Sequence, residues 1–243
     1  MGVRRLEWLL SGGFNVELLV RSGIWVGACA VALLAASARS MGVGPDFGLL
    51  ALAGLGTAGV YGFDRWATRG GSPAGWILPC LVAGVLGLRQ PPQAILILVA
   101  VCALALVHVR LRDLPWAKPV YIALAWIGVV VGLPWVLRGS APAPVALGPV
   151  ALAIAANVLA CDAVDREAEA AQIAPKKVWW IARAVAAAGV AVAFATGAAP
   201  LAAIPGCLLL ALVRWPADRR FAERVLDGAL LVGALAAIVL MGG

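Results

Sequence analysis

The sequence has few charged residues. Asp, Glu, Lys and Arg make up 13% of its 243 residues, whereas hydrophobic residues make up 63% and the mean hydropathy is +0.99. Ordinary soluble domains carry about 25% charged residues, so this composition excludes that class. No polar stretch is long enough for a separate soluble domain. We therefore expect the whole chain, 1–243, to form a single membrane domain.

Cysteines in paired spacing are also lacking. The five cysteines lie mostly inside apolar runs, where we interpret them as small packing residues rather than disulfides or metal ligands. The net charge is +7, but the basic residues are distributed over the segments between apolar runs. That distribution is typical of membrane loops and argues against a nucleic-acid partner.

What the sequence does contain is a series of apolar runs long enough to cross a bilayer. Residues 1–21 form a short amphipathic segment that we expect to lie at the membrane surface. The chain is then predicted to be all-α and polytopic, with nine transmembrane helices. The expected spans are about 23–39, 46–66, 74–88, 93–109, 119–137, 144–165, 177–196, 199–213 and 223–241.

The distribution of Lys and Arg predicts the orientation of these spans. With a cytoplasmic N-terminus, only Arg39, Arg89 and Arg138 fall in outer segments, and nearly all other basic residues fall in inner ones. Only one acidic residue, Asp46, is clearly outside. We therefore expect an integral protein of the bacterial inner membrane, with its C-terminus outside and its acidic clusters facing the cytoplasm.

The first of these clusters follows the sixth apolar run, in the stretch Asn157–Glu169. On a helix, Asp162 and Glu169 lie about 20° apart and Asp165 lies about 60° from Asp162, so three carboxylates share one face. Negative charge at a helix C-terminus near lipid is unfavourable, so a compensating cation is expected. Either a divalent metal ion or basic neighbours would serve, and with basic neighbours the stretch would be a solvated helix end without a site.

The second cluster, Tyr61-Gly62-Phe63-Asp64-Arg65, follows the second apolar run. Carboxylates on separate helices suit a diphosphate site, because they hold Mg²⁺ and Mg²⁺ bridges to phosphate oxygens. Nearby basic residues would hold the remaining phosphate charge; the candidates are Arg110, Arg112, Lys118 and Lys176. The alternative for Asp64 and Arg65 is an interfacial ion pair without a function.

Nine membrane helices with acidic motifs after the second and sixth resemble the UbiA superfamily of intramembrane prenyltransferases. The family's second motif often reads D-x-x-D-x-E-G-D, and this chain has Asp162-Ala-Val-Asp165-Arg-Glu167-Ala-Glu169. The family also often has a basic, proline-containing segment between helices four and five. This chain has Arg110-Leu-Arg112-Asp113-Leu-Pro115-Trp116-Ala-Lys118 there.

The first motif departs from the family pattern N-D-x-x-D-x-x-x-D. In the corresponding segment, 60–68, only Asp64 is acidic, and Tyr61 and Thr68 occupy the other two acidic positions. A chain with this substitution resembles a divergent branch of the family.

The resemblance implies a UbiA-type bundle that transfers a prenyl group from a polyprenyl diphosphate to a lipophilic, aromatic acceptor, assisted by Mg²⁺. It implies metal ligation by Asp64, Asp162, Asp165 and Glu169, of which the three aspartates would be catalytic. Diphosphate contacts would come from Arg65, Arg110, Arg112, Lys118 and Tyr61. The alternative is a relative without catalysis that binds an isoprenoid, quinone or pigment, or that serves as a structural subunit of a membrane complex.

Overall fold

The computed structural model describes residues 23–44, 46–69, 73–111, 117–139, 147–168, 174–213 and 222–242. Every regular element in these ranges is a helix, and they contain no β-strand. The all-α prediction is therefore confirmed for this part of the chain. The predicted surface segment 1–21 lies outside the described residues.

The described residues form nine continuous helical segments, each of which overlaps one expected span. Their bounds are α3 Ile24–Ser40, α4 Phe47–Arg69, α5 Ala74–Leu88, α6 Pro92–Leu111, α7 Ala117–Ile127 continued by η1 Gly128–Gly132 and α8 Leu133–Arg138, α9 Gly148–Ala168, α10 Pro175–Ala195, η3 Ala199–Ala202 continued by α11 Ala203–Ala211, and η4 Ala222–Leu226 continued by α13 Asp227–Leu240. Both η1 and η4 are π-helical.

Within the described ranges, three helical stretches are long and apolar enough to cross a membrane. They are Phe47–Ala67 in α4, Pro119–Arg138 through α7 to α8, and Pro175–Ala195 in α10. The other apolar helices are shorter, as the sequence predicts for the third and eighth spans. That all nine segments cross the bilayer remains a prediction.

The outer surface of the bundle carries many large apolar side chains. Examples are Leu78, Leu88, Phe194, Leu210 and Val239, which are 65%, 77%, 65%, 74% and 73% exposed. Soluble monomers rarely expose apolar surface on this scale, because its contact with water is unfavourable. Surrounding lipid removes that cost. The exposed apolar surface and the three long apolar helices therefore both indicate a membrane protein.

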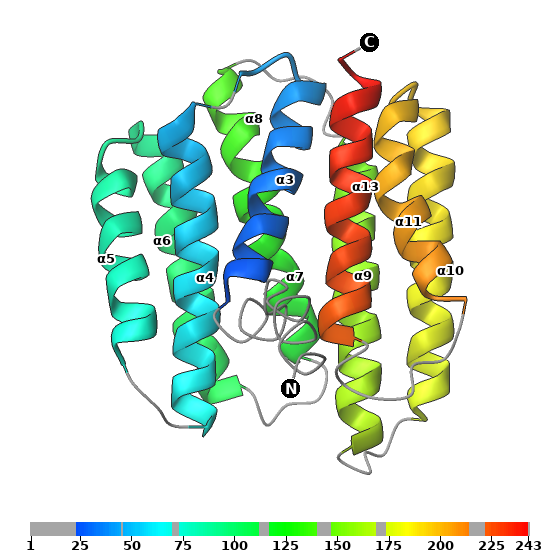
Figure 1. The fold of residues 1–243 in the computed structure, drawn as a ribbon, viewed down its shortest axis with the longest axis horizontal. Coiled ribbons are helices and arrows are strands. Elements are labelled where there is room, and N and C mark those ends of the chain that lie inside the picture. The colour runs from blue at the N-terminus through cyan, green and yellow to red at the C-terminus, as the bar shows by residue number, and fades with distance from the viewer. Residues whose placement is uncertain are drawn as a thin grey trace, which may run out of the picture.

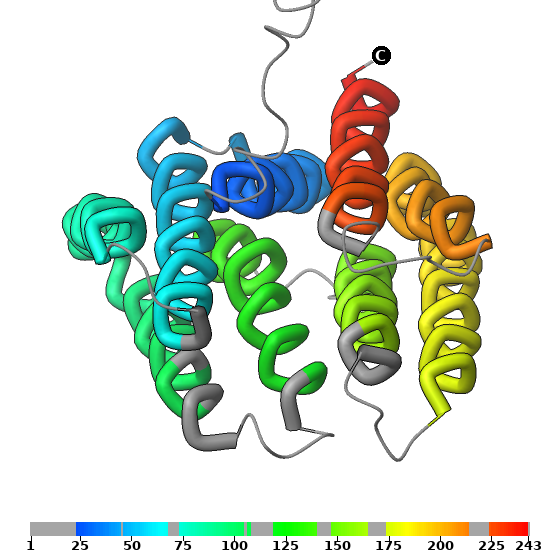
Figure 2. The backbone as a smooth tube through the Cα atoms, turned by 60° about the horizontal axis from the view of Figure 1, so that its bottom comes forward, coloured from blue at the N-terminus to red at the C-terminus, as the bar shows by residue number. Residues whose placement is uncertain are grey.

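The helices run alternately up and down (Figure 1). The C-terminal ends of α4, α6 and α9 and the N-terminal ends of α5, α7 and α10 lie at one end, which is at the bottom of Figure 1 and which we call the lower end. Figure 2 shows this end turned forward, with α7 between α4 and α9. In contrast, α3 begins well above the lower end (Figure 1).

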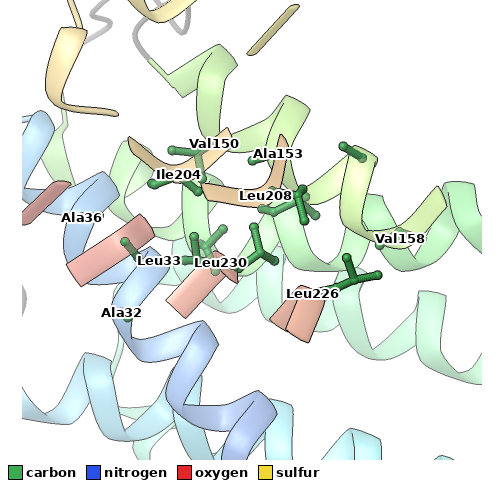
Figure 3. Close-up of a cluster of buried hydrophobic side chains, with 14 of the residues drawn as sticks. Ala32, Leu33, Ala36, Val150, Ala153, Val158, Ile204, Leu208, Leu226 and Leu230 are labelled. Carbon is green, nitrogen blue, oxygen red and sulfur yellow. The ribbon is translucent and has the colours of Figure 1, made fainter. Parts of the chain in front are cut away.

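The centre of the α9 side of the bundle is a dry core. Figure 3 shows Val150, Ala153 and Val158 of α9 meeting side chains from α11, α13 and α3. Leu33, Ile204, Leu208, Leu226 and Leu230 contribute from those helices, and none is more than 2% exposed. Core packing of this kind holds α9 in place along most of its length.

Glycine allows several helix pairs to approach closely, as expected for packing in lipid. A Cβ atom added to Gly27 of α3 would lie 2.7 Å from the carbonyl oxygen of Gly54 on α4. One added to Gly59 of α4 would lie 2.6 Å from the Sγ atom of Cys80 on α5. These contacts hold α4, which carries Asp64, between α3 and α5.

Candidate active site

The acidic stretch after the sixth span is helical through Ala168, the last residue of α9. Asp162 is one of the few buried charged or polar residues, with 7% of its surface exposed. Asp165 follows it one turn later in α9, but its side chain lies outside the described part of the structure, as does the whole of Glu169. The backbone therefore has the one-turn spacing expected for Asp162 and Asp165, and the position of Glu169 stays untested.

A carboxylate buried at a helix C-terminus is unfavourable unless a cation or hydrogen-bond donors compensate it. The position of Asp162 therefore fits an electrostatic partner such as a metal ion or a basic side chain. Mg²⁺ is commonly bound by one or two carboxylates together with substrate phosphates. The oxygen donors of Asp162 and Asp165 match this preference in chemistry and in sequence spacing.

The stretch after the second span lies in the last two turns of α4. Tyr61, Asp64 and Arg65 are all partly buried. The guanidinium carbon of Arg65 lies 5.6 Å from the centre of the Tyr61 ring, one turn earlier. A cation–π contact of this kind holds both side chains on one face of the helix.

Three aromatic rings, two from α4 and one from α5, pack together at this end of α4. The Phe63 and Trp76 rings are 5.0 Å apart in an edge-on arrangement, and Trp66 lies 5.6 Å from Trp76. A Cβ atom on Gly62 would lie 3.0 Å from the Cβ atom of Trp76, so the two helices are in close contact here. The cluster fixes the helix turn that carries Asp64 and Arg65.

The predicted basic segment is described only at its edges. Arg110 lies in the last turn of α6 and Lys118 in the first turn of α7, but neither side chain is described, and Arg112 lies outside the described residues. Both helix ends are at the lower end of the bundle, as are the ends of α4 and α9 (Figures 1 and 2). The backbone therefore brings all four predicted segments to one end.

Within that end, Asp64 and Asp162 come from helices that are not close neighbours. In the described part of the chain α4 packs mainly against α3 and α5, whereas α9 packs against α10, α7 and α11. Among the described residues there is also no group of three His, Cys, Asp or Glu side chains close enough to hold a metal ion. The side chain of Asp165 and all of Glu169 are outside that search, so metal binding by the full set remains a prediction.

Arg183 lies about two turns into α10, where an arginine can either pair with a carboxylate such as Asp162 or Asp165 or extend toward the membrane surface. Its guanidinium carbon lies 4.3 Å from the centre of the Trp180 ring, one turn nearer the lower end of α10. Trp180 is 62% exposed, so the contact lies on the outer side of the helix. This geometry favours an interfacial, snorkelling arginine.

Sequence reasoning missed a polar contact near the middle of the bundle. The Nδ2 atom of Asn157 in α9 donates to Oδ1 of Asp227, the first residue of α13, at 3.1 Å. The thiol of Cys29 in α3 donates to the carbonyl oxygen of Asp227 at 3.3 Å. Polar residues inside otherwise apolar spans are the signal that could have indicated this cluster.

Comparison with known proteins identifies no matching family model, no matching curated protein and no matching solved structure. The resemblance to the UbiA superfamily therefore depends on the residues and the order of the helices. It enters below as a proposal.

Proposed function

We propose that this chain is an intramembrane prenyltransferase of the UbiA type, which transfers a prenyl group from a polyprenyl diphosphate to a lipophilic aromatic acceptor. The observation that supports this most is the buried carboxylate of Asp162 at the C-terminal end of α9. That end of α9 lies at the same end of the bundle as Asp64 and the basic ends of α6 and α7. A diphosphate needs this combination of carboxylates for a metal and basic groups for phosphate oxygens.

In the proposed reaction, Asp162, Asp165 and Glu169 would hold Mg²⁺ from the α9 side, and Asp64 would contribute from α4. When bound, Mg²⁺ would neutralise the charge that develops on the diphosphate. Arg110, Arg112 and Lys118 bind the remaining phosphate oxygens, and Arg65 and Tyr61 orient the group from α4. The apolar tail lies among the Ala- and Gly-rich helices.

The chemical step breaks the bond between the allylic carbon of the donor and the diphosphate oxygen, and both electrons leave with the diphosphate. A new bond forms between that carbon and a nucleophilic carbon of the acceptor, which loses a proton. The acidic clusters and the N-terminus face the cytoplasm, where water-soluble diphosphate can leave. The proposed location is the bacterial inner membrane.

A second function is favoured by two observations on α4. This helix supplies one carboxylate where the family pattern has three, and it shares no extensive contact with α9 among the described residues. A protein that binds an isoprenoid, quinone or pigment without turnover, or a structural subunit of a membrane complex, would retain the bundle without needing a complete metal site.

The two functions are separated by lipid mass spectrometry of membranes from cells with and without the protein. The transferase predicts a prenylated lipid that is absent without the protein and is restored by the wild-type chain. Purified protein in nanodiscs should also release diphosphate from geranylgeranyl diphosphate when Mg²⁺ and a lipid extract are present. Unchanged lipid profiles together with no diphosphate release would exclude the transferase and leave the binding protein.

A further inference from the structure

Four residues from three helices form a polar cluster in the interior of the bundle. Asn157 of α9 and Cys29 of α3 both donate to Asp227 at the start of α13. Trp25, one turn before Cys29, contacts the next residue of α13, since its Cζ2 atom would lie 3.5 Å from a Cβ atom on Gly228. We call Trp25, Cys29, Asn157 and Asp227 the midbundle cluster.

Two polar atoms of this cluster are buried without a hydrogen-bond partner in the described part of the structure. One is the Nε1 atom of Trp25, a donor, and the other is the Oδ1 atom of Asn157, an acceptor. Asn157 as a whole is only 8% exposed. Its amide orientation follows from chemistry, because Nδ2 can donate to the Asp227 carboxylate whereas Oδ1 would be repelled by it.

Buried polar groups are rarely left unpaired, since each loses its hydrogen bonds to water on burial. A single group that lies between them, and that both donates and accepts, would satisfy both atoms. A hydroxyl fits, because its proton can be donated to Oδ1 of Asn157 while its oxygen accepts from Nε1 of Trp25. A carbonyl would satisfy only Trp25, and an ammonium group would satisfy only the acceptors.

The apolar residues around the midbundle cluster indicate what kind of molecule could carry this hydroxyl group. Leu33 of α3, Leu226 of η4 and Leu230 of α13 lie within four residues of a cluster member in the sequence. All three are fully buried and belong to the dry core in Figure 3. A molecule that reaches the cluster must therefore carry its hydroxyl on an apolar body that is soluble in the membrane. We propose that the midbundle cluster binds the hydroxyl group of a membrane-soluble alcohol or phenol, held between Trp25 and Asn157.

This site is separate from the carboxylates of the proposed transferase. Asn157 precedes Asp162 by five residues, which corresponds to about 7.5 Å along the helix axis and about 140° around it. The two side chains therefore face different sides of α9. Binding at the midbundle cluster requires neither Mg²⁺ nor a diphosphate, so it can be tested even if the chain transfers no prenyl group.

The test is equilibrium binding of matched probes to the full chain in nanodiscs. One pair is 4-nonylphenol and 4-nonylanisole, and the other is geranylgeraniol and its methyl ether; each ether keeps the apolar body but lacks the hydroxyl proton. We expect the hydroxyl compound of at least one pair to bind about two- to tenfold more tightly than its ether. The pair with the larger preference identifies the ligand as a phenol or an aliphatic alcohol.

Variants then assign the preference to the cluster. Trp25→Phe keeps a ring but removes the N–H donor, so it should weaken binding of the hydroxyl compound about two- to tenfold. The ether oxygen also accepts from this N–H, so ether binding should weaken as well. Trp76→Phe is the matched control, because Nε1 of Trp76 is also buried without a partner among the described residues but lies in the aromatic cluster of α4 and α5. Asn157→Leu should remove the preference for hydroxyl over ether if the variant folds, because it removes the acceptor of the hydroxyl proton. If it does not fold, the question is decided by a loss of hydroxyl affinity in Trp25→Phe that is absent in Trp76→Phe.

The proposal is overturned if neither pair shows a hydroxyl preference in the wild-type protein. It is equally overturned if Trp25→Phe binds the hydroxyl compound as tightly as the wild-type protein does, or if Trp76→Phe weakens that binding as much. A structural water at the cluster would give the first of these results, since neither probe would then use the two atoms.

Discussion

Asn157 and Asp227 form a hydrogen bond of 3.1 Å across a sequence separation of 70 residues. The bond joins the middle of α9 to the residue at which α13 begins. Asp227 also accepts the Cys29 thiol through its backbone carbonyl, so α3 is tied to the same point. The contact therefore ties α9 and α3 to the same residue of α13.

We expect Asp227→Ala to lower the free energy of unfolding by about 1–3 kcal/mol, because Nδ2 of the buried Asn157 then loses its acceptor. Asp227→Asn retains an oxygen in the same place and should cost clearly less. Thermal unfolding of the purified protein in detergent measures both variants. Equal losses for the two substitutions would show that the hydrogen bond to Asn157 does not contribute to stability.

The contact between α4 and α5 gives a second stability prediction. A Cβ atom at Gly59 would lie 2.6 Å from Sγ of Cys80, so Gly59→Ala should destabilise the protein by about 1–3 kcal/mol through overpacking. Gly84→Ala on α5 is the control, because a Cβ atom there meets nothing within 4 Å. Adding Cys80→Ala to Gly59→Ala should restore part of the lost stability. If Gly59→Ala unfolds at the same temperature as Gly84→Ala, the close approach of α4 and α5 at this point is contradicted.

The all-helical architecture and the approximate helix bounds could be predicted from the sequence, because the length of each apolar run sets the length of a helix in lipid. Pro and Gly mark the ends, as where Gly139 adopts φ +67° directly after α8. The π-helical stretch Gly128–Gly132 was not predicted, and the expected span 119–137 was treated as one uniform helix. Apolar periodicity does not distinguish a π-helical turn from an α-helical one, since the difference depends on packing against α3 and α6.

The site was predictable only in part, for a different reason. Residues close in sequence, such as Asp162 and Asp165, acquire a shared face from helix geometry alone. The pairing of Asn157 with Asp227 depends on which distant helices pack together, and a single sequence contains no direct signal of that choice. Likewise, the expected alternatives for Arg183 could be compared only once Trp180 was found beneath its guanidinium group.

The proposed transferase makes a specific prediction for the carboxylates. Asp162→Asn should reduce Mg²⁺-dependent diphosphate release by roughly 100-fold or more. Loss of a residue that only hydrogen-bonds to a metal ligand already lowers activity by about 10- to 100-fold, and loss of a ligand itself should cost at least as much. Asp64→Asn should reduce it as well, because α4 has no other acidic residue in its motif. Asp46→Asn is the control at the opposite end of α4 and should leave the rate unchanged. A full rate in Asp162→Asn would remove this residue from the mechanism.

Orientation is tested by labelling introduced cysteines from outside intact cells. Lys176 lies in the first turn of α10 at the lower end and is exposed, whereas Gln90 lies between α5 and α6 at the other end. A membrane-impermeant maleimide should label Gln90→Cys in intact cells, and Lys176→Cys only after the membrane is permeabilised, because the excess of Lys and Arg places the lower end in the cytoplasm. The wild-type protein serves as the background control, since its five cysteines lie within helices, where lipid and protein should keep the reagent from them. The reverse pattern would move both acidic clusters to the outer face and leave a cytoplasmic diphosphate donor without access to Asp162.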